Sequence, residues 1–415
     1  MDKKLEKLIE KESIRQNKTI DLIPSENLMS GDILSILGSP LANKYSEGYP
    51  EKRYYPGNVF CDQIEIMAQE AALKAFGLAS EKWAANVQPY SGSPANLAVY
   101  TGLMGPGDTL LGMKLSSGGH LTHGHKVSVT GRFFSSIQYG MGKGGKIDYA
   151  EIEKLAKKHK PKVIISGTTA YPRKLDFKKF GEIADSVGAY HVADISHIAG
   201  LVLTGNHQAP FKYAHVVTMT THKTLRGPRG AIIISRKEPL ISGERTINEA
   251  IDRAVFPGLQ GGPHNNQTAA IAQCFYESVR PEFKKYGAQI IKNAKALEVG
   301  LKKRGFKLVT GGTDNHLLLI DLHNLGISGK DAQDRLERNG IIANRNTVPG
   351  DSSPFNPSGI RAGTPSVTTR GMKEKDMEKI SDLMYRAIVL KENVLAETET
   401  LALKYPAVKF VKWKK

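Results

Sequence analysis

The sequence predicts an α/β fold, in which a mainly parallel sheet is sandwiched by helices and accompanied by an N-terminal arm and a smaller C-terminal α+β domain. From Trp83 to Ser235, short apolar runs alternate with longer helical patterns, which is the order of a sheet whose parallel strands are joined by helices. The runs are apolar on both faces, as in strands covered from both sides. A length of 415 residues suits two domains rather than one small core.

The composition is that of an ordinary globular protein. Hydrophobic residues make up 40% and charged residues 24%, and no apolar run reaches membrane-spanning length. The charged segment Met1–Glu12 lacks the apolar centre of a signal peptide. Only Cys61 and Cys274 are present, which argues against a disulfide framework and a cysteine zinc site. We therefore expect a soluble, cytoplasmic protein with no membrane partner.

The formal net charge is +17, and the tail Lys409–Lys415 contributes to it. Such an excess can serve nucleic-acid binding, but the lysines are spread along the chain and no RNA or DNA motif accompanies them. Attraction of anionic small molecules, or solubility, is the favoured interpretation. An RNA-binding protein with a vestigial enzyme site is kept as an alternative.

The first part of the chain predicts helices and an arm. Residues 1–20 form a charged amphipathic pattern, and residues 59–76 have apolar positions near a 3.6-residue period. Between them, Asn43–Asn58 contains four tyrosines with Gly and Pro punctuation. A loop of this kind binds a ligand or packs at a subunit interface, and both uses stay open.

The remaining elements follow the alternating pattern. Because ligands of such sheets collect at the carboxyl ends of the strands, side chains there are the candidates for chemistry. A helix-rich stretch and a turn at 311–315 lead into the smaller domain. The predicted strands are 84–88, 109–113, 162–166, 189–193, 215–220, 231–235 and, around the turn, 306–322; the predicted helices are 94–104, 149–159, 175–187, those within 265–304, 329–339 and 372–396.

Lys223 lies in a tight turn between two predicted buried strands. The β-branched run before it and the Gly227–Gly230 turn after it leave the amine little room to reach water. In a dry site its pKa falls and it becomes a better nucleophile toward an aldehyde, which favours Schiff-base chemistry. A solvated basic turn including Arg226 and Arg229 is an equal alternative.

Two further stretches have polar groups at strand ends. Ser93 is a good N-cap and Pro94 suits the first helical position, so a helix start is predicted there. Such a start holds a phosphate well, but from this stretch alone an ordinary capped helix is favoured. His120, His123 and His125 form a close trio in a glycine-rich loop. Stacking of a histidine ring on a flat ligand is favoured over a zinc site, since no cysteine or carboxylate lies in that stretch.

Asp194 and Arg361 are the remaining candidates. A carboxylate at the end of a buried strand requires a cation or a good donor, and a pyridinium nitrogen is one such group. From the residue alone, capping of the next helix or a pair with Arg226 is favoured. An arginine inside a short apolar strand suits two-pronged carboxylate binding or a structural ion pair. Together with Lys223 and the Ser91–Ser93 helix start, these groups supply the contacts that pyridoxal phosphate bound to an amino acid needs.

Over nearly its whole length the chain resembles the serine hydroxymethyltransferases, in the aspartate-aminotransferase-like class of pyridoxal-phosphate enzymes (fold type I). The motifs are long and specific. They are Ser25-Glu-Asn27, Asn43-Lys-Tyr-Ser-Glu-Gly-Tyr-Pro50, Arg53-Tyr-Tyr55, Ala85-Asn-Val-Gln-Pro89, Gly118-Gly-His-Leu-Thr-His-Gly124, Thr220-Thr-His-Lys-Thr-Leu-Arg-Gly-Pro-Arg229, Gln260-Gly-Gly-Pro263, Gly311-Gly-Thr-Asp-Asn-His316 and Ser358-Gly-Ile-Arg-Ala-Gly-Thr-Pro365.

The resemblance implies a role for each site residue. Lys223 carries the cofactor covalently, Asp194 pairs with its pyridine nitrogen and His120 stacks on its ring, while Glu47 handles protons near the serine hydroxyl and His222 influences reaction specificity. The other implied cofactor contacts are Ser91, Gly92, Ser93, Thr169, His197, Tyr45 and Gly262; the substrate contacts are Ser25, Tyr55, Glu47 and Arg361; the folate contacts are Leu115, Gly119, His120, Leu121, Asn346, Ser353, Pro354 and Phe355. No metal is implied.

The implied reaction is reversible transfer of the serine hydroxymethyl group to tetrahydrofolate, giving glycine and 5,10-methylenetetrahydrofolate. A homodimer with shared active sites is implied, in which the partner supplies Tyr45, Tyr55 and Gly262. The domains would be an arm at 1–70 that contributes to the dimer interface, a large cofactor-binding domain at 71–275 and a small domain at 276–415. A modified pterin acceptor and a threonine-type aldolase are the alternatives.

Overall fold

The computed structural model describes residues 1–241, 243, 245–351 and 355–407. The chain divides into two compact units. The larger unit consists of Met29–Thr169 and Lys174–Gly287, and the smaller unit of Met1–Leu28, Ala170–Arg173 and Ala288–Lys415. Helix α11 (Pro281–Lys303) contains residues of both units. Among the described residues, no helix has the length and apolar character needed to span a bilayer.

The larger unit is built on a mainly parallel sheet, as predicted. Within the described residues its strands follow the order β4-β10-β9-β8-β7-β5-β6, and only β10 runs antiparallel to its neighbours. The bounds are β4 Trp83–Asn86, β5 Thr109–Met113, β6 Ser135–Tyr139, β7 Val163–Ser166, β8 Tyr190–Asp194, β9 Val216–Thr220 and β10 Ala231–Arg236. This arrangement confirms the predicted fold class.

Strand β6 was not predicted. Its sequence, Ser-Ser-Ile-Gln-Tyr, has a single aliphatic residue, and it lies at the sheet edge next to β5. An edge strand buries less of each side chain than a central strand, so its sequence does not need an apolar run. Only Tyr139 in this strand is fully buried.

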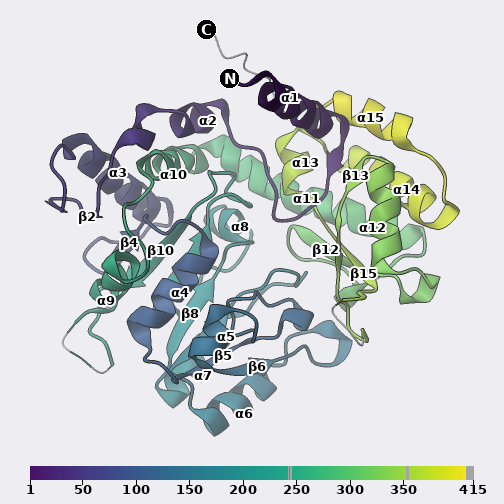
Figure 1. Cartoon of the computed structure of the whole chain (residues 1–415). Helices are drawn as coiled ribbons and strands as arrows, with labels where there is room; N and C mark the ends of the chain where they lie inside the picture. The colour runs from purple at the N-terminus through teal and green to yellow at the C-terminus, as the bar shows by residue number, and fades with distance from the viewer. Residues whose placement is uncertain (242, 244, 352–354, 408–415) are drawn as a thin grey trace. The chain divides into compact units, whose positions relative to one another are not determined.

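Helices cover both faces of this sheet (Figure 1). On one face, α4 (Gly92–Leu103) and α9 (Ile247–Arg253) share a buried cluster with Val163, Ile165 and Val192. On the other face, Phe180 of α7 (Phe177–Val187) stacks on His191 at a ring distance of 5.8 Å. Because successive side chains of a strand point to opposite faces, this alternation explains why the central strands are apolar throughout.

Helix α4 begins earlier than the sequence predicted. Ser91 is the N-cap residue and the helix starts at Gly92, so the prediction of Ser93 as cap and Pro94 as first helical residue was wrong. Glycine has low helix propensity and gives no sequence signal for a helix start. The remaining elements of the larger unit are α2 Gly31–Leu37, β2 Gly48–Tyr49, β3 Lys52–Arg53, α3 Val59–Ala75, α5 Val129–Phe133, α6 Tyr149–His159, α8 Ala199–Leu203 and α10 Asn265–Ser278.

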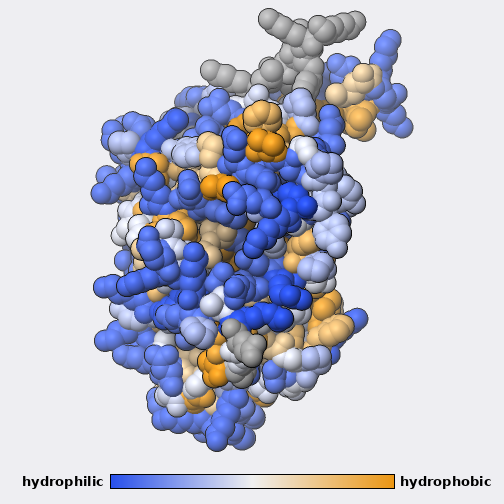
Figure 2. All heavy atoms as spheres, turned by 90° about the vertical axis from the view of Figure 1, so that its left-hand side faces the viewer, coloured by the Kyte–Doolittle hydropathy of each residue, from blue (hydrophilic) through white to orange (hydrophobic). Residues whose placement is uncertain are grey.

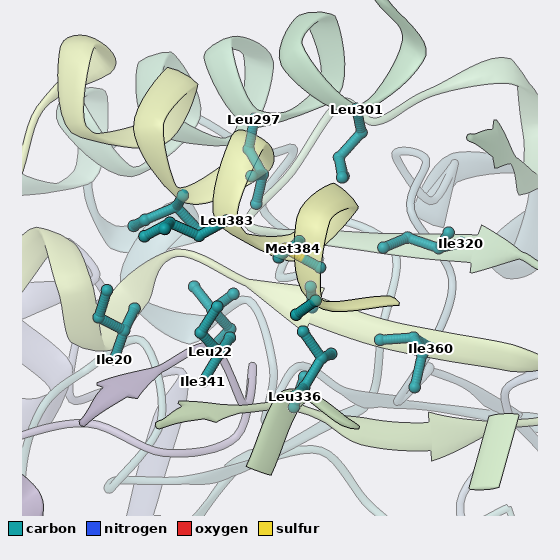
Figure 3. Close-up of a cluster of buried hydrophobic side chains, with 14 of the residues drawn as sticks. Ile20, Leu22, Leu297, Leu301, Ile320, Leu336, Ile341, Ile360, Leu383 and Met384 are labelled. Carbon is teal, nitrogen blue, oxygen red and sulfur yellow. The ribbon is translucent and has the colours of Figure 1, made fainter. Parts of the chain in front are cut away.

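The smaller unit is an α+β structure. Its antiparallel sheet has the order β11-β12-β15-β14, and β1 pairs with β13 in parallel. Figure 3 shows the core between these strands and α11, α12 and α14, where Leu297, Ile320, Leu336 and Met384 pack together. The bounds are α1 Lys3–Lys18, β1 Ile20–Asp21, β11 Lys307–Leu308, β12 Leu317–Asp321, α12 Gly329–Arg338, β13 Ile341–Ile342, β14 Asn344–Asn346, β15 Gly359–Gly363, α13 Pro365–Thr369, α14 Glu374–Tyr385 and α15 Leu395–Leu403.

Candidate active site

Lys223 lies in the turn that joins strands β9 and β10. The turn is closed by hydrogen bonds from Gly227 N–H to the Thr221 carbonyl (2.7 Å) and from Thr221 N–H to the Gly230 carbonyl (3.1 Å). Arg226 N–H donates to the Lys223 carbonyl at 3.1 Å. These bonds fix the backbone on both sides of the half-buried lysine.

Arg226 stabilises the turn rather than pairing with Asp194. Its φ is +64°, a left-handed conformation that is unusual for a residue with a side chain. The guanidinium lies over the rings of Tyr286 (5.1 Å) and Phe283 (5.9 Å) of α11. Cation–π contacts of this kind hold the side chain against the helix.

Asp194 ends strand β8 as a buried carboxylate. Its Oδ2 accepts hydrogen bonds from Asn96 Nδ2 (2.9 Å) and His123 Nε2 (3.2 Å), and its Oδ1 accepts one from the Ser196 N–H (3.0 Å). Burial alone would raise the pKa of Asp194, but the bond from His123 and the nearby positive charges outweigh it and hold the pKa below its usual range. The group is therefore an anion at neutral pH.

Asn96 connects Asp194 to two threonines. Asn96 Nδ2 also donates to Thr122 Oγ1 at 2.9 Å, and Asn96 Oδ1 accepts from Thr218 Oγ1 at 2.7 Å. This asparagine is buried in α4, at a position flanked by apolar side chains. Asn96 was not among the predicted site residues, although an asparagine between apolar residues of a predicted helix is a signal that could have identified it.

The two histidines of the loop after β5 have defined protonation. His123 Nδ1 accepts from the His120 N–H (3.3 Å), so the ring proton of His123 lies on Nε2 and points to Asp194. His120 Nδ1 accepts from the Thr122 N–H (3.2 Å). Burial lowers the pKa of His120 to about 4, so its ring is neutral at pH 7 and suited to stacking on a flat ligand.

The start of α4 has the features of a phosphate site. The first N–H groups of a helix have no intrahelical partner and attract anions. Within the described part of the chain, the Ser91 side chain makes no capping hydrogen bond. A Cβ on Gly92 would lie 2.8 Å from Thr220 Cγ2, so only glycine fits between the helix start and the end of β9.

Two buried polar atoms near Lys223 are consistent with a bound cofactor. Thr220 Oγ1 and His222 Nδ1 have no hydrogen-bond partner among the described residues. Such atoms are costly unless a ligand or water satisfies them. Burial lowers the pKa of His222 to about 3, so this ring is also neutral. With the buried anion Asp194, these residues fit pyridoxal phosphate.

Thr169 and His197 each follow the carboxyl end of a strand in the same sheet. Thr169 follows β7 and donates from its N–H to the Gly118 carbonyl (2.7 Å) and from Oγ1 to the Gly119 carbonyl (3.1 Å). The buried His197 follows β8, and its carbonyl accepts from Thr224 Oγ1 at 3.0 Å. Lys223, Asp194, Ser91–Ser93, Thr169 and His120 thus follow the carboxyl ends of β9, β8, β4, β7 and β5, where a ligand was predicted.

The loop at residues 43–58, which contains Glu47, is anchored by Arg53. Its guanidinium donates to Glu65 Oε2 (2.6 Å) and to the carbonyls of Ser46 (2.9 Å) and Gly48 (2.7 Å). The Arg53 side chain is only 4% exposed, so this ion pair is buried and well screened from water. Because the anchored carbonyls flank Glu47, the backbone of this residue is fixed.

Glu47 belongs to a cluster at the surface of the larger unit. Tyr45 Oη donates to Glu47 Oε1 at 3.2 Å, and the ring of Tyr45 meets that of Tyr55 edge-on at 5.1 Å. A Cβ on Gly261 would lie 3.0 Å from Glu47 Oε1, and one on Gly262 would lie 3.4 Å from the Tyr45 ring. Tyr45 and Tyr55 are 54% and 44% exposed, so this cluster faces outward.

Arg361 and Ser25 belong to the smaller unit. Arg361 lies in the middle of β15, and its Nε donates to Asn344 Oδ1 at 3.1 Å. Burial lowers the pKa of Arg361 to about 10, which leaves it a cation at neutral pH. Gly363 N–H donates to the Leu22 carbonyl (2.7 Å), so the segment before Ser25 runs against the strand that carries Arg361.

The predicted folate residues are divided between the units. Leu115, Gly119, His120 and Leu121 belong to the larger unit, where Gly119 fits against the Met113 carbonyl without room for a side chain. In the smaller unit, Asn346 Nδ2 donates to the Thr347 carbonyl and Phe355 is 91% exposed. Ser353 and Pro354 lie outside the described residues.

His120, His123 and His125 were weighed as a zinc site from the sequence. In the ranges that the structure describes, no group of three or more His, Cys, Asp and Glu side chains is arranged to hold a metal ion. His123 instead bonds to Asp194, and His125 Nδ1 accepts from the Val127 N–H at 3.4 Å.

Comparison with known proteins identifies the family. The family model described as serine hydroxymethyltransferase matches residues 1–384. Relatives named serine hydroxymethyltransferase include one from Rickettsia canadensis, 52% identical over 406 residues that cover 96% of this chain and 94% of the relative. Another, from Desulfotalea psychrophila, is 50% identical over 414 residues, with 98% and 94% covered. The chain therefore belongs to the serine hydroxymethyltransferase family.

Proposed function

We propose that the residues gathered around Lys223 and Asp194 carry out the reaction of this family in the present chain. That reaction is the reversible transfer of the serine hydroxymethyl group to tetrahydrofolate, with pyridoxal phosphate as cofactor and glycine and 5,10-methylenetetrahydrofolate as products. The observation that supports the assignment best is the buried Asp194 carboxylate beside the lysine turn, which accepts hydrogen bonds from Asn96, His123 and Ser196 and whose pKa is held low, against its burial, chiefly by the bond from His123.

The cofactor would be held by residues of the larger unit. Pyridoxal phosphate, when bound, supplies an electron-accepting ring for the bonds broken at the amino-acid Cα. In this proposal Lys223 would attach it covalently, and Asp194 would pair with its ring nitrogen and keep that nitrogen protonated. His120 would stack on the ring as a neutral imidazole. The remaining contacts would come from Ser91, Gly92, Ser93, Thr169 and His197 of the same chain and from Tyr45 and Gly262 of the second copy in the proposed dimer.

Arg361 would bind the substrate carboxylate. Its guanidinium stays charged at neutral pH despite burial, and it can bond both oxygens of a carboxylate. Ser25 and Tyr55 would complete this contact. Glu47 would take and return the proton of the serine hydroxyl at Oε1, the oxygen to which Tyr45 donates. His222, neutral and next to Lys223, would influence which bond of the substrate is broken.

Folate would be bound by two loops. Leu115, Gly119, His120 and Leu121 form the first, in the segment whose carbonyls Thr169 holds. Asn346 and Phe355 would contribute from the second, and Ser353 and Pro354, which lie outside the described residues, stay expected contacts. The net charge of +17 favours an acceptor with a glutamate tail, because opposite charge raises the rate of encounter.

We also propose a homodimer with shared active sites and a cytoplasmic location. The arm and α3 expose large apolar side chains, including Tyr54 (81%), Val59 (65%) and Phe60 (74%), as expected of a surface that a second copy covers. Figure 2 shows hydrophobic patches within an otherwise hydrophilic face.

The proposed division of the chain is an arm at 1–70, a cofactor-binding domain at 71–275 and a small domain at 276–415. Tyr45, Tyr55 and Gly262 would reach the partner's site.

The proposed function is tested by product analysis. The purified chain, supplied with pyridoxal phosphate, serine and tetrahydrofolate, should form glycine and 5,10-methylenetetrahydrofolate in equal amounts. Lys223→Arg should abolish this turnover, because the guanidinium cannot attach the cofactor. Formation of glycine at the same rate without any pterin would favour a threonine-type aldolase, and no reaction in either case would contradict the proposal.

A further inference from the structure

The segment between β7 and α7 is held by hydrogen bonds to two loops, one in each unit of the chain. At its start, Thr169 donates from its N–H to the Gly118 carbonyl (2.7 Å) and from Oγ1 to the Gly119 carbonyl (3.1 Å). Both carbonyls belong to the loop between Leu115 and Leu121, which is proposed to bind folate. The position of Thr169 therefore determines where the backbone of this loop lies.

The four residues after Thr169 belong to the smaller unit, where Arg173 anchors them. Arg173 Nη2 donates to the Thr310 carbonyl (2.6 Å), Nε to Thr310 Oγ1 (3.0 Å) and Nη1 to Asp314 Oδ1 (2.8 Å). The planar guanidinium makes all three bonds from one fixed geometry. A lysine in its place can make only one or two of them.

The loop that receives Arg173 is shaped for this segment. Thr310 has φ of +61°, which a residue with a side chain rarely adopts and which the surrounding contacts must maintain. Asp314 N–H donates to the Pro172 carbonyl (2.7 Å), and Asn315 Nδ2 donates to the Tyr171 carbonyl (2.9 Å). Consecutive residues from Tyr171 to Arg173 are thus each bonded to this loop.

We propose that Arg173 is a positioning residue for the folate subsite. By fixing residues 170–173 to the loop Thr310–Asn315, it keeps the covalently adjacent Thr169 bonded to the carbonyls of Gly118 and Gly119. Without this anchor, Thr169 and the folate loop sample other positions, and binding must first restore the correct one. The proposal rests on the proposed function in one respect, the assignment of the Leu115–Leu121 loop to folate.

The first test is amide hydrogen exchange followed by mass spectrometry. Arg173→Ala should raise exchange about ten-fold in peptides that contain the Thr169 amide and the Leu115–Leu121 loop. The matched control is Arg304→Ala, which removes a similarly buried arginine of the smaller unit that bonds the Gly300 carbonyl (3.0 Å) and Glu378 (3.0 Å). The control should destabilise its own surroundings and leave those two peptides unchanged.

The second test is folate affinity, measured by titrating tetrahydrofolate into the glycine-saturated holoenzyme. Arg173→Ala should weaken binding about ten-fold while Arg304→Ala leaves it unchanged, a coupling of ordinary size for two connected sites. Arg173→Lys, which keeps the charge and serves if the alanine variant does not fold, should also weaken binding, though less than alanine, because it loses at least one of the three bonds. Equal exchange and equal affinity in the Arg173 and Arg304 variants would overturn the proposal. A wild-type chain that binds no folate would overturn the proposed function instead, and the exchange comparison would still decide the part of Arg173.

Discussion

Replacing Asn96 by leucine removes the side chain that connects Asp194 to its neighbours. Leucine has the same number of side-chain heavy atoms, branched at the same position, so the change leaves no cavity. It removes a donor to Asp194 Oδ2 (2.9 Å) and the acceptor of the Thr218 hydroxyl (2.7 Å). Asp194 keeps the bonds from His123 and Ser196. The variant therefore perturbs the carboxylate without deleting it.

The cost follows from the groups left behind. Each buried polar group that loses a partner costs about 1–3 kcal/mol. Asn96→Leu affects two such groups, the Asp194 carboxylate and the Thr218 hydroxyl, so we expect the free energy of unfolding to fall by about 2–6 kcal/mol. Fewer donors to the anion also raise the pKa of Asp194 toward its usual range. The group stays ionised at neutral pH, but without the Asn96 bond its Oδ2 is less firmly held in place to pair with a protonated ring nitrogen, so affinity for pyridoxal phosphate should fall about ten-fold, equivalent to about 1.4 kcal/mol.

The control is Asn293→Leu in the smaller unit. Asn293 is also a fully buried helical asparagine, and its Nδ2 donates to Thr368 Oγ1 (2.8 Å) and the Met372 carbonyl (2.9 Å). Urea unfolding of the apoproteins should show comparable losses of stability for the two variants. Titration with pyridoxal phosphate should show weaker binding only for Asn96→Leu. If both variants bound the cofactor as tightly as the wild type, the network around Asp194 would be structural only and our reasoning would be refuted.

Three other perturbations follow from the same structure. Arg361→Lys should raise the KM for serine by roughly 10- to 100-fold through loss of a two-pronged, charge-assisted contact; steady-state kinetics measure this, and an unchanged KM would remove Arg361 from the carboxylate site. Burial lowers the pKa of His191 to about 4, so the unfolded chain, with a histidine pKa of about 6.5, takes up the proton first and stability falls as pH drops from about 6.5 toward 4. At pH 5 this histidine should account for about 2 kcal/mol of the lost stability. Urea unfolding of His191→Gln at pH 7.5 and pH 5 should show a pH dependence that is smaller by this amount. The same pH dependence as in the wild type would contradict the assignment to His191. Phe60→Asp, at a side chain that is 74% exposed, should convert the dimer to a folded monomer by light scattering, and a persistent dimer would exclude this surface.

The sequence predicted those elements whose signals are local. The central strands β5, β7, β8 and β9 are short β-branched or apolar runs, and they form within a residue or two of the predicted ranges. The edge strand β6 has no such run and was missed. The start of α4 was placed at Ser93 because serine and proline are strong signals, whereas Gly92, which the close approach of Thr220 requires, is a weak one.

The site was predicted as a set of residues but not as a network. Asp194 ends β8, Lys223 and His120 lie in the segments after β9 and β5, and the family motifs include Lys223 and His120. The partners of Asp194 come from α4, the loop after β5 and the start of the segment after β8, and the spacing of Asn96, His123 and Ser196 along the chain does not reveal that they meet. The anchoring of Arg173 by Thr310 likewise spans 137 residues. Contacts of this range depend on the folded chain.

The central claim is that Lys223 and Asp194 form a site which removes a proton from the Cα of glycine, the reverse direction of the reaction. The most direct measurement is the loss of the glycine α-proton signal in D2O, followed by NMR with and without tetrahydrofolate. The wild-type holoenzyme should exchange one α-proton, faster when the folate is present, and Asp194→Asn with the cofactor still bound should lose most of this exchange. An Asp194→Asn holoenzyme that exchanged the proton as fast as the wild type, or a wild-type holoenzyme that did not exchange it at all, would contradict the account.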